Sequence, residues 1–164
     1  MSRIPQNINS VIEFTKSIAV LPFVNMSADP DNEYFSDGIT EEIINALTTI
    51  QGLKVIARTS SFAFKGKNID VRTIGNQLGV TTVLEGSVRK VSNRVRITAQ
   101  LISTDDGSHI WSKNFDREMK DIFGLKAEIS LLIADQIREN FGYLEIPSFP
   151  NAIPTQISRL MIYG

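Results

Sequence analysis

The sequence predicts an α+β fold in which two to three helices pack on a mixed five-stranded sheet. The chain has 164 residues, of which 42% are hydrophobic, so it is long enough for one domain with a core and short for two. Apolar residues recur at both strand and helix spacing, and two long strands are joined by a tight turn. The predicted order is β-α-β-α-β-β-β-α, which packs the helices against the sheet.

The domain is expected over residues 17–142. Residues 1–16 are polar and weakly patterned, and we interpret them as an N-terminal extension. Residues 143–164 carry prolines and no core face, which indicates a C-terminal linker toward a missing module. The apolar side chains of this linker predict either a free tail or a homo-oligomer formed through it.

The first half of the domain alternates strand and helix. Residues 17–25 are almost all apolar, as in a strand covered on both faces, and Pro22 should make this strand bulge or lose pairing. A helix is expected over 34–50, and a short strand over 53–57. The inner positions of the helix repeat at helical spacing and are Ile39, Ile43, Ala46, Leu47 and Ile50.

A short helix and a hairpin follow. Asp70 is placed to cap the helix at its N-terminus, and Gly79 is placed to end it. Residues 82–91 and 94–103 should form the two strands of the hairpin, joined by a two-residue turn. The residues predicted to face the core in the second of these strands alternate, and are Val95, Ile97, Ala99 and Leu101.

The last strand and the last helix close the domain. The strand is expected over 109–117, with Trp111 and Phe115 in the core on the face that the helix covers. The helix is expected over 120–141. Its inner stripe is predicted to consist of Ile122, Leu125, Ile129, Leu132, Ile133 and Ile137.

Composition excludes several kinds of chemistry. Cys is absent, which excludes disulfides and thiolate sites, and the single His, His109, excludes a multi-histidine metal site. A formal net charge of -1 offers no global excess of positive charge to nucleic acid or to an anionic membrane. No apolar run reaches the length of about 18 residues that a bilayer span needs. We expect any export or anchoring segment of a parent protein to lie outside this chain.

Nothing in the residue spacing predicts catalysis. No nucleophile motif accompanies His109, and no pair of carboxylates is spaced for acid–base work. We therefore expect no catalytic residue, no metal and no cofactor. The acidic run from Asp29 to Glu33 lacks the loop pattern of a calcium site, so a solvated loop is the favoured interpretation.

Charged residues are segregated along the chain. Residues 17–53 hold six acids and no Lys or Arg, whereas residues 54–104 hold nine bases and two acids. Such an asymmetry can orient a charged partner. The alternative is that the two segments meet in the fold and neutralise each other.

The segment over 58–70 is the first candidate partner-binding surface. It interleaves basic and aromatic side chains, as single-stranded nucleic-acid sites do, so nucleic-acid or nucleotide binding is one alternative. It lacks the glycine motifs of phosphate-binding loops. A second alternative is that its phenylalanines pack under the crossover. The residues predicted to face a partner are Arg58, Ser60, Phe62, Phe64 and Lys65.

The hairpin is the second candidate surface. Four basic residues gather near its tip, and they are Arg89, Lys90, Arg94 and Arg96. One interpretation is an acidic partner that Arg89 and Arg94 contact. The other is a solvated hairpin whose charges protect it against edge pairing.

Three long blocks of the sequence carry a specific resemblance. They are SIAVLPFVNMSADPDNEYFSDGITEEIINAL, GLKVIARTSSFAFKGKNIDVRTIGNQLGVTTVLEGSVRK and NRVRITAQLISTDDGSHIWSKNFDREMKDIFGLKAEIS. Over residues 17–141 the chain resembles the TolB-like amino-terminal domain of bacterial TPR-containing proteins. Such proteins often also carry a class III adenylate cyclase or a winged-helix DNA-binding domain. The end PTQISRLMIYG resembles the entry to a TPR array.

The resemblance implies helices on a mixed five-stranded sheet and no catalytic residues, so that any cyclase activity would reside in a separate domain. It also implies a membrane span ahead of the domain and hence the periplasmic side, with the cytoplasm as the alternative. We therefore predict a non-catalytic sensing or protein-interaction module of a larger bacterial regulatory or envelope protein, with a protein as its partner. The alternatives are the regulatory part of an adenylate cyclase and a nucleic-acid or nucleotide-binding domain.

Overall fold

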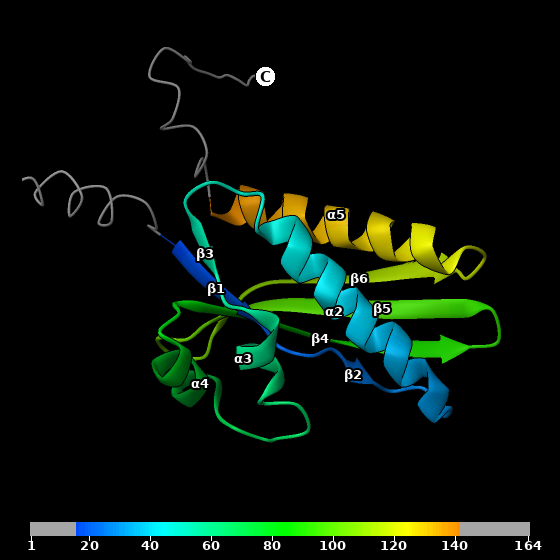
Figure 1. Ribbon diagram of the computed structural model, residues 1–164, viewed down its shortest axis with the longest axis horizontal. Helices are drawn as coiled ribbons and strands as arrows, with labels where there is room; N and C mark the ends of the chain where they lie inside the picture. The colour runs from blue at the N-terminus through cyan, green and yellow to red at the C-terminus, as the bar shows by residue number, and fades with distance from the viewer. Residues whose placement is uncertain (1–15, 142–164) are drawn as a thin grey trace, which may run out of the picture.

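The computed structural model describes residues 16–141, and within them six strands form one mixed sheet of the predicted α+β class. Five strands follow one another in the order β3-β1-β4-β5-β6, and β2 pairs with β4 off this path (Figure 1). β1 is parallel to β3 and β4, whereas β4, β5 and β6 are antiparallel. The strands are β1 (Lys16–Val20), β2 (Val24–Asn25), β3 (Leu53–Val55), β4 (Thr82–Val91), β5 (Arg94–Ser103) and β6 (His109–Glu118).

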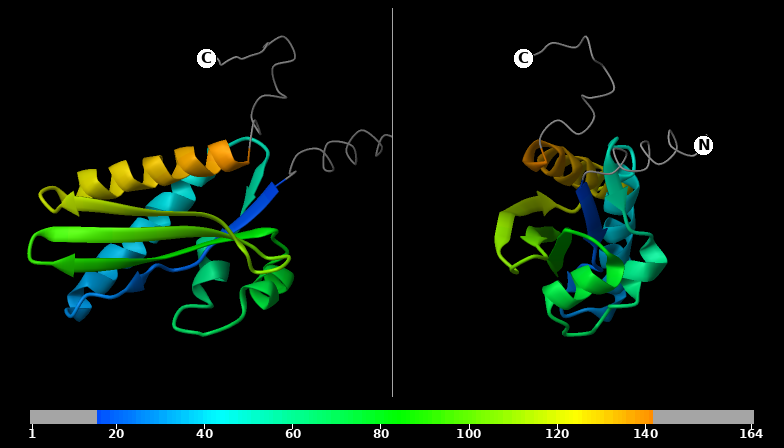
Figure 2. Two further views of the ribbon diagram at one scale, coloured as in Figure 1. Left: turned by 180° about the vertical axis from the view of Figure 1, so that it is seen from behind. Right: turned by 90° about the vertical axis from the view of Figure 1, so that its left-hand side faces the viewer.

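Two long helices cover one face of the sheet. α2 (Glu33–Leu47), which follows the short 3-10 helix η1 (Pro30–Asn32), lies beside α5 (Ile122–Asn140) on this face (Figures 1 and 2). The predicted inner residues of β5 are all at most 2% exposed and pack in the same core cluster as the inner residues of both helices. The predicted alternation of β5 is therefore confirmed.

The opposite face is covered at one end only. Ile74 of α4 (Val71–Leu78) packs there with Ala19 and Val83 in a second, smaller cluster. Their strand neighbours Ile18 and Leu84 belong to the main core, because successive strand residues point to opposite faces. The short helix α3 (Arg58–Phe62) leads into this part of the chain. None of the helices in the described region has the length and apolar character that a membrane crossing requires.

The break predicted at Pro22 is confirmed. β1 pairs with β4 as far as Val20 opposite Leu84, and pairing resumes with Val24 opposite Ser87. Three residues of the first strand therefore face two residues of β4, which is the excess that defines a bulge. The N–H of Phe23, which lies in this break, donates to the Thr40 hydroxyl of α2 at 2.9 Å, and its side chain is 1% exposed.

The local signals around α4 are also confirmed, whereas α3 was missed. The Asp70 carboxylate accepts the backbone N–H of Arg72 at the start of α4, and Gly79 ends the helix in the left-handed conformation, at φ +69°. α3 has only five residues, too few to show a helical period. Residues 1–15, the expected helix end at Gly142 and the linker 143–164 lie outside the described residues.

Four of the predicted core residues lie nearer the surface than expected. Ala46 and Leu132 are only partly buried. Ile122 is 48% exposed because α5 begins at this residue, and the buried stripe starts one turn later at Leu125. Trp111 packs against the main core but is only half-buried, whereas Phe115 on the same strand is 3% exposed. β6 is the outermost strand, so the predicted face of Trp111 is right and its predicted depth is wrong.

The contact between Phe23 and Gly86 gives a test of the packing. A Cβ at Gly86 would lie 2.1 Å from the Thr98 carbonyl oxygen and 2.6 Å from the Phe23 ring. Gly86→Ala should lower the free energy of unfolding by about 1–3 kcal/mol or more, because neither the backbone nor a fully enclosed ring can give way.

The matched control is Gly38→Ala in α2. Its Cβ would meet only the Lys126 side chain, whose Nζ lies 3.0 Å away and can move. Alanine also favours the helix by up to about 1 kcal/mol, so this variant should unfold at an equal or higher urea concentration. A Gly86→Ala variant as stable as the parent chain would contradict the packing described.

Candidate functional site

The part of the sheet that α4 leaves uncovered forms the candidate site. Seen from behind, β4, β5 and β6 face outward while α3 and α4 lie at one end (Figure 2, left). We define the open face as the outward-pointing residues of these strands with Val24 of β2. They are Val24, Glu85, Ser87, Arg89, Val91, Arg94, Arg96, Thr98, Gln100, Ser112, Asn114, Asp116 and Glu118, which are all half-buried or exposed.

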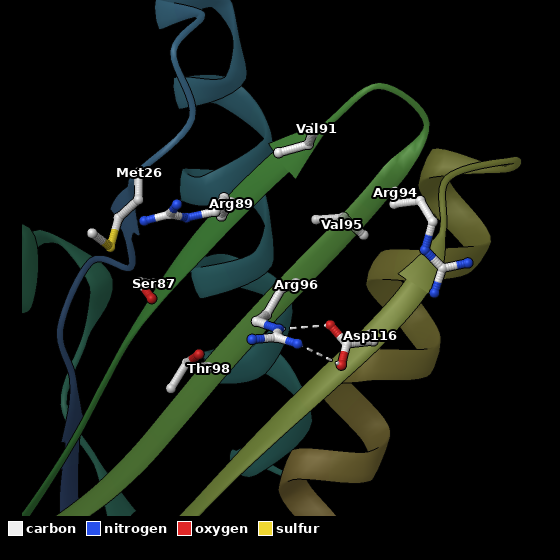
Figure 3. Close-up of a pocket in the computed structure, with 9 residues that line it drawn as sticks. All are labelled: Met26, Ser87, Arg89, Val91, Arg94, Val95, Arg96, Thr98 and Asp116. Carbon is white, nitrogen blue, oxygen red and sulfur yellow. Dashed lines mark hydrogen bonds and ion pairs between the residues drawn. The ribbon is translucent and has the colours of Figure 1, made fainter.

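Two adjoining hollows run along the open face. The first lies at the hairpin end and is lined by Met26 and by residues of β4, β5 and β6 around Arg89 (Figure 3). The second lies between the sheet and the segment over 64–68 that follows α3. Ser87 and Thr98 line both hollows, so together they make one groove that could seat an extended chain.

Charge is unevenly paired in the first hollow. Arg89 and Arg96 stand directly opposite each other on β4 and β5, an arrangement that like charges make unfavourable. Arg96 is neutralised by Asp116, which accepts from its Nε at 2.8 Å and from its Nη2 at 3.3 Å. The Arg89 side chain turns the other way, toward Met26 (Figure 3), and it makes no hydrogen bond or ion pair with any residue in the described part.

The Arg96–Asp116 ion pair changes the pKa of the Asp116 carboxyl. The hydrogen bond from Arg96 lowers the pKa of the Asp116 carboxyl below its ordinary value, and the charges of Arg96, Arg94 and Arg117 act in the same direction. The carboxylate is therefore charged at neutral pH and occupied by Arg96. It does not neutralise Arg89.

Exposed apolar side chains border the same groove. Val24, Met26 and Val91 are 59%, 52% and 64% exposed, and each lines one of the two hollows. Single exposed apolar residues are ordinary, but three of them along one groove are typical of a surface that contacts another molecule. The groove thus combines aliphatic contacts with an unpaired guanidinium.

The segment over 58–70 is partly committed to contacts inside the domain. Arg58 pairs with Glu41 of α2 and lies over the Phe62 ring, 4.0 Å from its centroid. Lys65 contacts Glu33 at 2.8 Å and Asp37 at 2.7 Å. Partial burial would by itself lower the pKa of Lys65, but its bonds to these two carboxylates raise it. The acidic and basic segments therefore meet here, as the neutralising interpretation predicted.

The predicted partner-binding residues fall into three groups. Phe64 and Lys65 line the second hollow, and Arg89 and Arg94 line the first. Arg58, Ser60 and Phe62 line neither. A role in partner binding stays a prediction for all seven residues, because no contact within the domain tests it.

The sequence did not indicate Met26, Val24 or Ser87 as site residues. Met26 and Val24 reach the groove because β2 pairs in parallel with β4, which is a contact between segments far apart in the sequence. The four basic residues predicted to cluster at the hairpin tip lie on two different faces of the sheet. Lys90 is opposite Val95, a core residue, so it points to the other side of the sheet from Arg89.

The arrangement suits binding by ion pairs, hydrogen bonds and apolar contacts. Within residues 16–141, no three His, Asp or Glu side chains lie close enough together to hold a metal ion. His109 is exposed on β6. The open face has guanidinium and hydroxyl donors, but it holds no nucleophile joined to a base.

Comparison with known proteins adds a family and a fold. Residues 14–131 match the family described as HilA/YgeH-like transcriptional regulator, second domain. The chain is 53% identical to "Putative adenylate cyclase 3" of Rhizobium meliloti (strain 1021) over 122 residues, 74% of this chain and 21% of that protein. The chain thus spans about a fifth of the length of this curated relative.

Solved structures share the fold at low identity. Lipoprotein GNA1162 from Neisseria meningitidis matches with a TM-score of 0.56 and 18% identity over 76% of this chain and 99% of its own. TolB from Acinetobacter baumannii matches with a TM-score of 0.53 and 13% identity over 77% of this chain and 28% of its own. The expected likeness to TolB is therefore one of fold, and the family match carries a different name.

The Arg96–Asp116 pair predicts a specific change in titration. Arg96→Gln should raise the pKa of Asp116 toward its ordinary value of about 3.9, because the largest cause of the shift is removed. The side-chain carboxyl signal, followed by NMR against pH, measures this. Arg72→Gln is the control, because Arg72 lowers the pKa of Asp70, to about 2, and not that of Asp116. This variant should leave the titration of Asp116 unchanged.

The sign of the accompanying stability change follows from linkage. Because the folded-state pKa of Asp116 lies below the unfolded one, the pair stabilises the fold above the unfolded pKa, and this is lost as pH falls through the folded pKa. The pH dependence of unfolding should be weaker in Arg96→Gln over that acidic window. An unchanged Asp116 titration in this variant would contradict the pairing.

Proposed function

The chain belongs to the family of HilA/YgeH-like transcriptional regulators, second domain, and from this premise we propose that it is a non-catalytic protein-interaction module of a larger bacterial regulatory protein. The open face is the surface that meets the partner. The single observation that carries the proposal is the groove on that face, where Val24, Met26 and Val91 are exposed beside Arg89.

The comparisons support a regulatory role for this chain rather than a catalytic one. The match spans about a fifth of the Rhizobium meliloti relative, whose name is that of a putative cyclase, so most of that protein lies outside the shared region. Among the described residues, no group of three or more His, Asp or Glu side chains could hold a metal ion. We therefore assign any cyclase activity to other domains of a parent protein, with this module as a regulatory part.

The cellular side is also a proposal. The TolB-like resemblance, and the naming of GNA1162 as a lipoprotein, support the periplasmic side of a membrane-anchored parent. The transcriptional-regulator family supports the cytoplasm as the second candidate. Alkaline phosphatase is active only in the periplasm, so its fusion after this domain in the full-length parent tests the cellular side. Phosphatase activity would support the periplasm, and its absence would support the cytoplasm.

The enzyme alternative makes a direct prediction. The purified chain, incubated with ATP and either Mg²⁺ or Mn²⁺, should form no cyclic AMP above a heat-treated sample of the same protein. Cyclic AMP formation that scales with protein concentration would contradict the proposal, because it would place nucleotide chemistry in this domain.

The interaction itself is tested by photo-crosslinking in the cell. The full-length parent, made in its own bacterium, would carry benzoylphenylalanine at Val24 of the open face. Leu131 on α5 is the matched control site, because it is 60% exposed against 59% for Val24 and lies on the helical layer. Irradiation should give a discrete protein adduct from position 24 and none from position 131.

The adduct also identifies the kind of partner. An adduct with twice the mass of the parent would show self-association through the open face, and a different mass would show another protein. Adducts of equal yield from both positions, or none from either, would contradict a partner at the open face.

A further inference from the structure

We propose that the first hollow binds a carboxylate side chain from an extended acidic segment of the protein partner, with Arg89 as its main contact. This inference rests on the proposed function and names the chemistry of the partner at the same face. The occupant is a peptide segment that lies along the groove, and every second residue, which points into the groove, is acidic and aliphatic in turn.

The charge of the hollow requires an anion that the domain does not supply. Three arginines line it, Arg89, Arg94 and Arg96, against one carboxylate, Asp116. Asp116 is held by Arg96 through two hydrogen bonds. Arg89 is opposite Arg96 and gains no compensating partner within residues 16–141. A carboxylate brought by another protein would relieve this like-charge pair.

The donors around Arg89 fit a carboxylate. A guanidinium presents a planar fork that bonds both oxygens of a carboxylate, a geometry that Arg96 and Asp116 already display beside it (Figure 3). The Ser87 side chain lines the same hollow, is half-buried and makes no hydrogen bond with any described residue. It provides a further hydroxyl donor for the same anion.

The exposed apolar residues of the groove indicate which other side chains the partner peptide carries. Met26 lies across from Arg89, Val91 follows it toward the turn, and Val24 lies in the second hollow. Side chains of an extended peptide alternate between two directions, so those that point to the groove can be acidic at Arg89 and aliphatic at Met26 or Val24. Met side chains adapt to partners of varied shape.

The same residues favour a peptide over nucleic acid. No aromatic ring lines the first hollow, so a base has nothing to stack on there. The hollow holds an acid of its own, and the second hollow holds Glu85 beside Lys65 and Lys67. A nucleic-acid site instead needs a continuous basic surface facing successive phosphates.

The test uses the full chain and a defined probe. The probe is a short fluorescein-labelled peptide in which every second residue is Glu and Val in turn, with Ser between them, and its control is the same peptide with Gln in place of Glu. Fluorescence anisotropy at low salt should show binding of the Glu peptide and at least about tenfold weaker binding of the Gln peptide, because a charge-assisted bond is lost.

Matched protein variants locate the contact. Arg89→Gln should weaken binding of the Glu peptide by about tenfold. Lys54→Gln removes the same charge from β3, at the far edge of the sheet, and should leave binding unchanged. Both side chains are exposed, and circular dichroism verifies that both variants fold. Amide NMR shifts caused by the Glu peptide should fall on the open face.

Each other outcome overturns the inference in a stated way. Equal binding of the two peptides, or equal binding by Arg89→Gln, would show that no carboxylate is recognised at Arg89. Tighter binding of single-stranded DNA, abolished by Arg89→Gln, would assign the hollow to nucleic acid. If position 24 crosslinks in the cell while the Glu peptide does not bind, the carboxylate inference fails and the proposed function stands.

Discussion

The break in the first strand at Pro22 is the constraint on which the rest of the domain depends. Proline cannot donate to the ladder, and the strand resumes one residue out of step with β4. Phe23 fills the break, over the bare backbone of Gly86, and its N–H donates to Thr40 of α2. The break in the first strand therefore provides a hydrogen bond between the sheet and α2. The extra residue also reverses the direction in which the following side chains point, so that Val24 reaches the open face opposite Ser87 and Met26 lines the first hollow with Arg89.

The open face exists because the second helical layer is shorter than the sheet. β4 and β5 have ten residues each, which corresponds to about 33 Å, whereas the eight residues of α4 span about 12 Å. The longer helices α2 and α5 complete the other face. The outward residues of β4 beyond Val83 are thus not covered by a helix in the described part, and polar side chains stand there at Glu85, Ser87 and Arg89.

Local signals made most of the fold predictable. Pro22 and Gly79 act through their own backbone, and Asp70 acts through the side chain that caps the following helix. The strict alternation of β5 shows which of its faces is buried. Depth was not predictable for Trp111, because burial in an outermost strand depends on what lies beyond its edge. The site was predictable only in part. Arg89 and Arg94 are adjacent through a hairpin, whereas Met26 joins them through parallel pairing that no local pattern encodes.

The pattern of charges explains why one end of the groove is more available than the other. At the α2 side, Lys65 meets two carboxylates and Arg58 meets Glu41, so the segregation along the sequence is cancelled in the fold. These pairs are partly exposed and add little to stability. They do, however, occupy the cations that a partner would otherwise contact. Of the three arginines that line the first hollow, only Arg96 is in an ion pair with a described residue. Asp116 is engaged by Arg96, so Arg89 on the opposite strand has no ion-pair partner within residues 16–141, and the inferred preference of the open face for an anion rests on this difference.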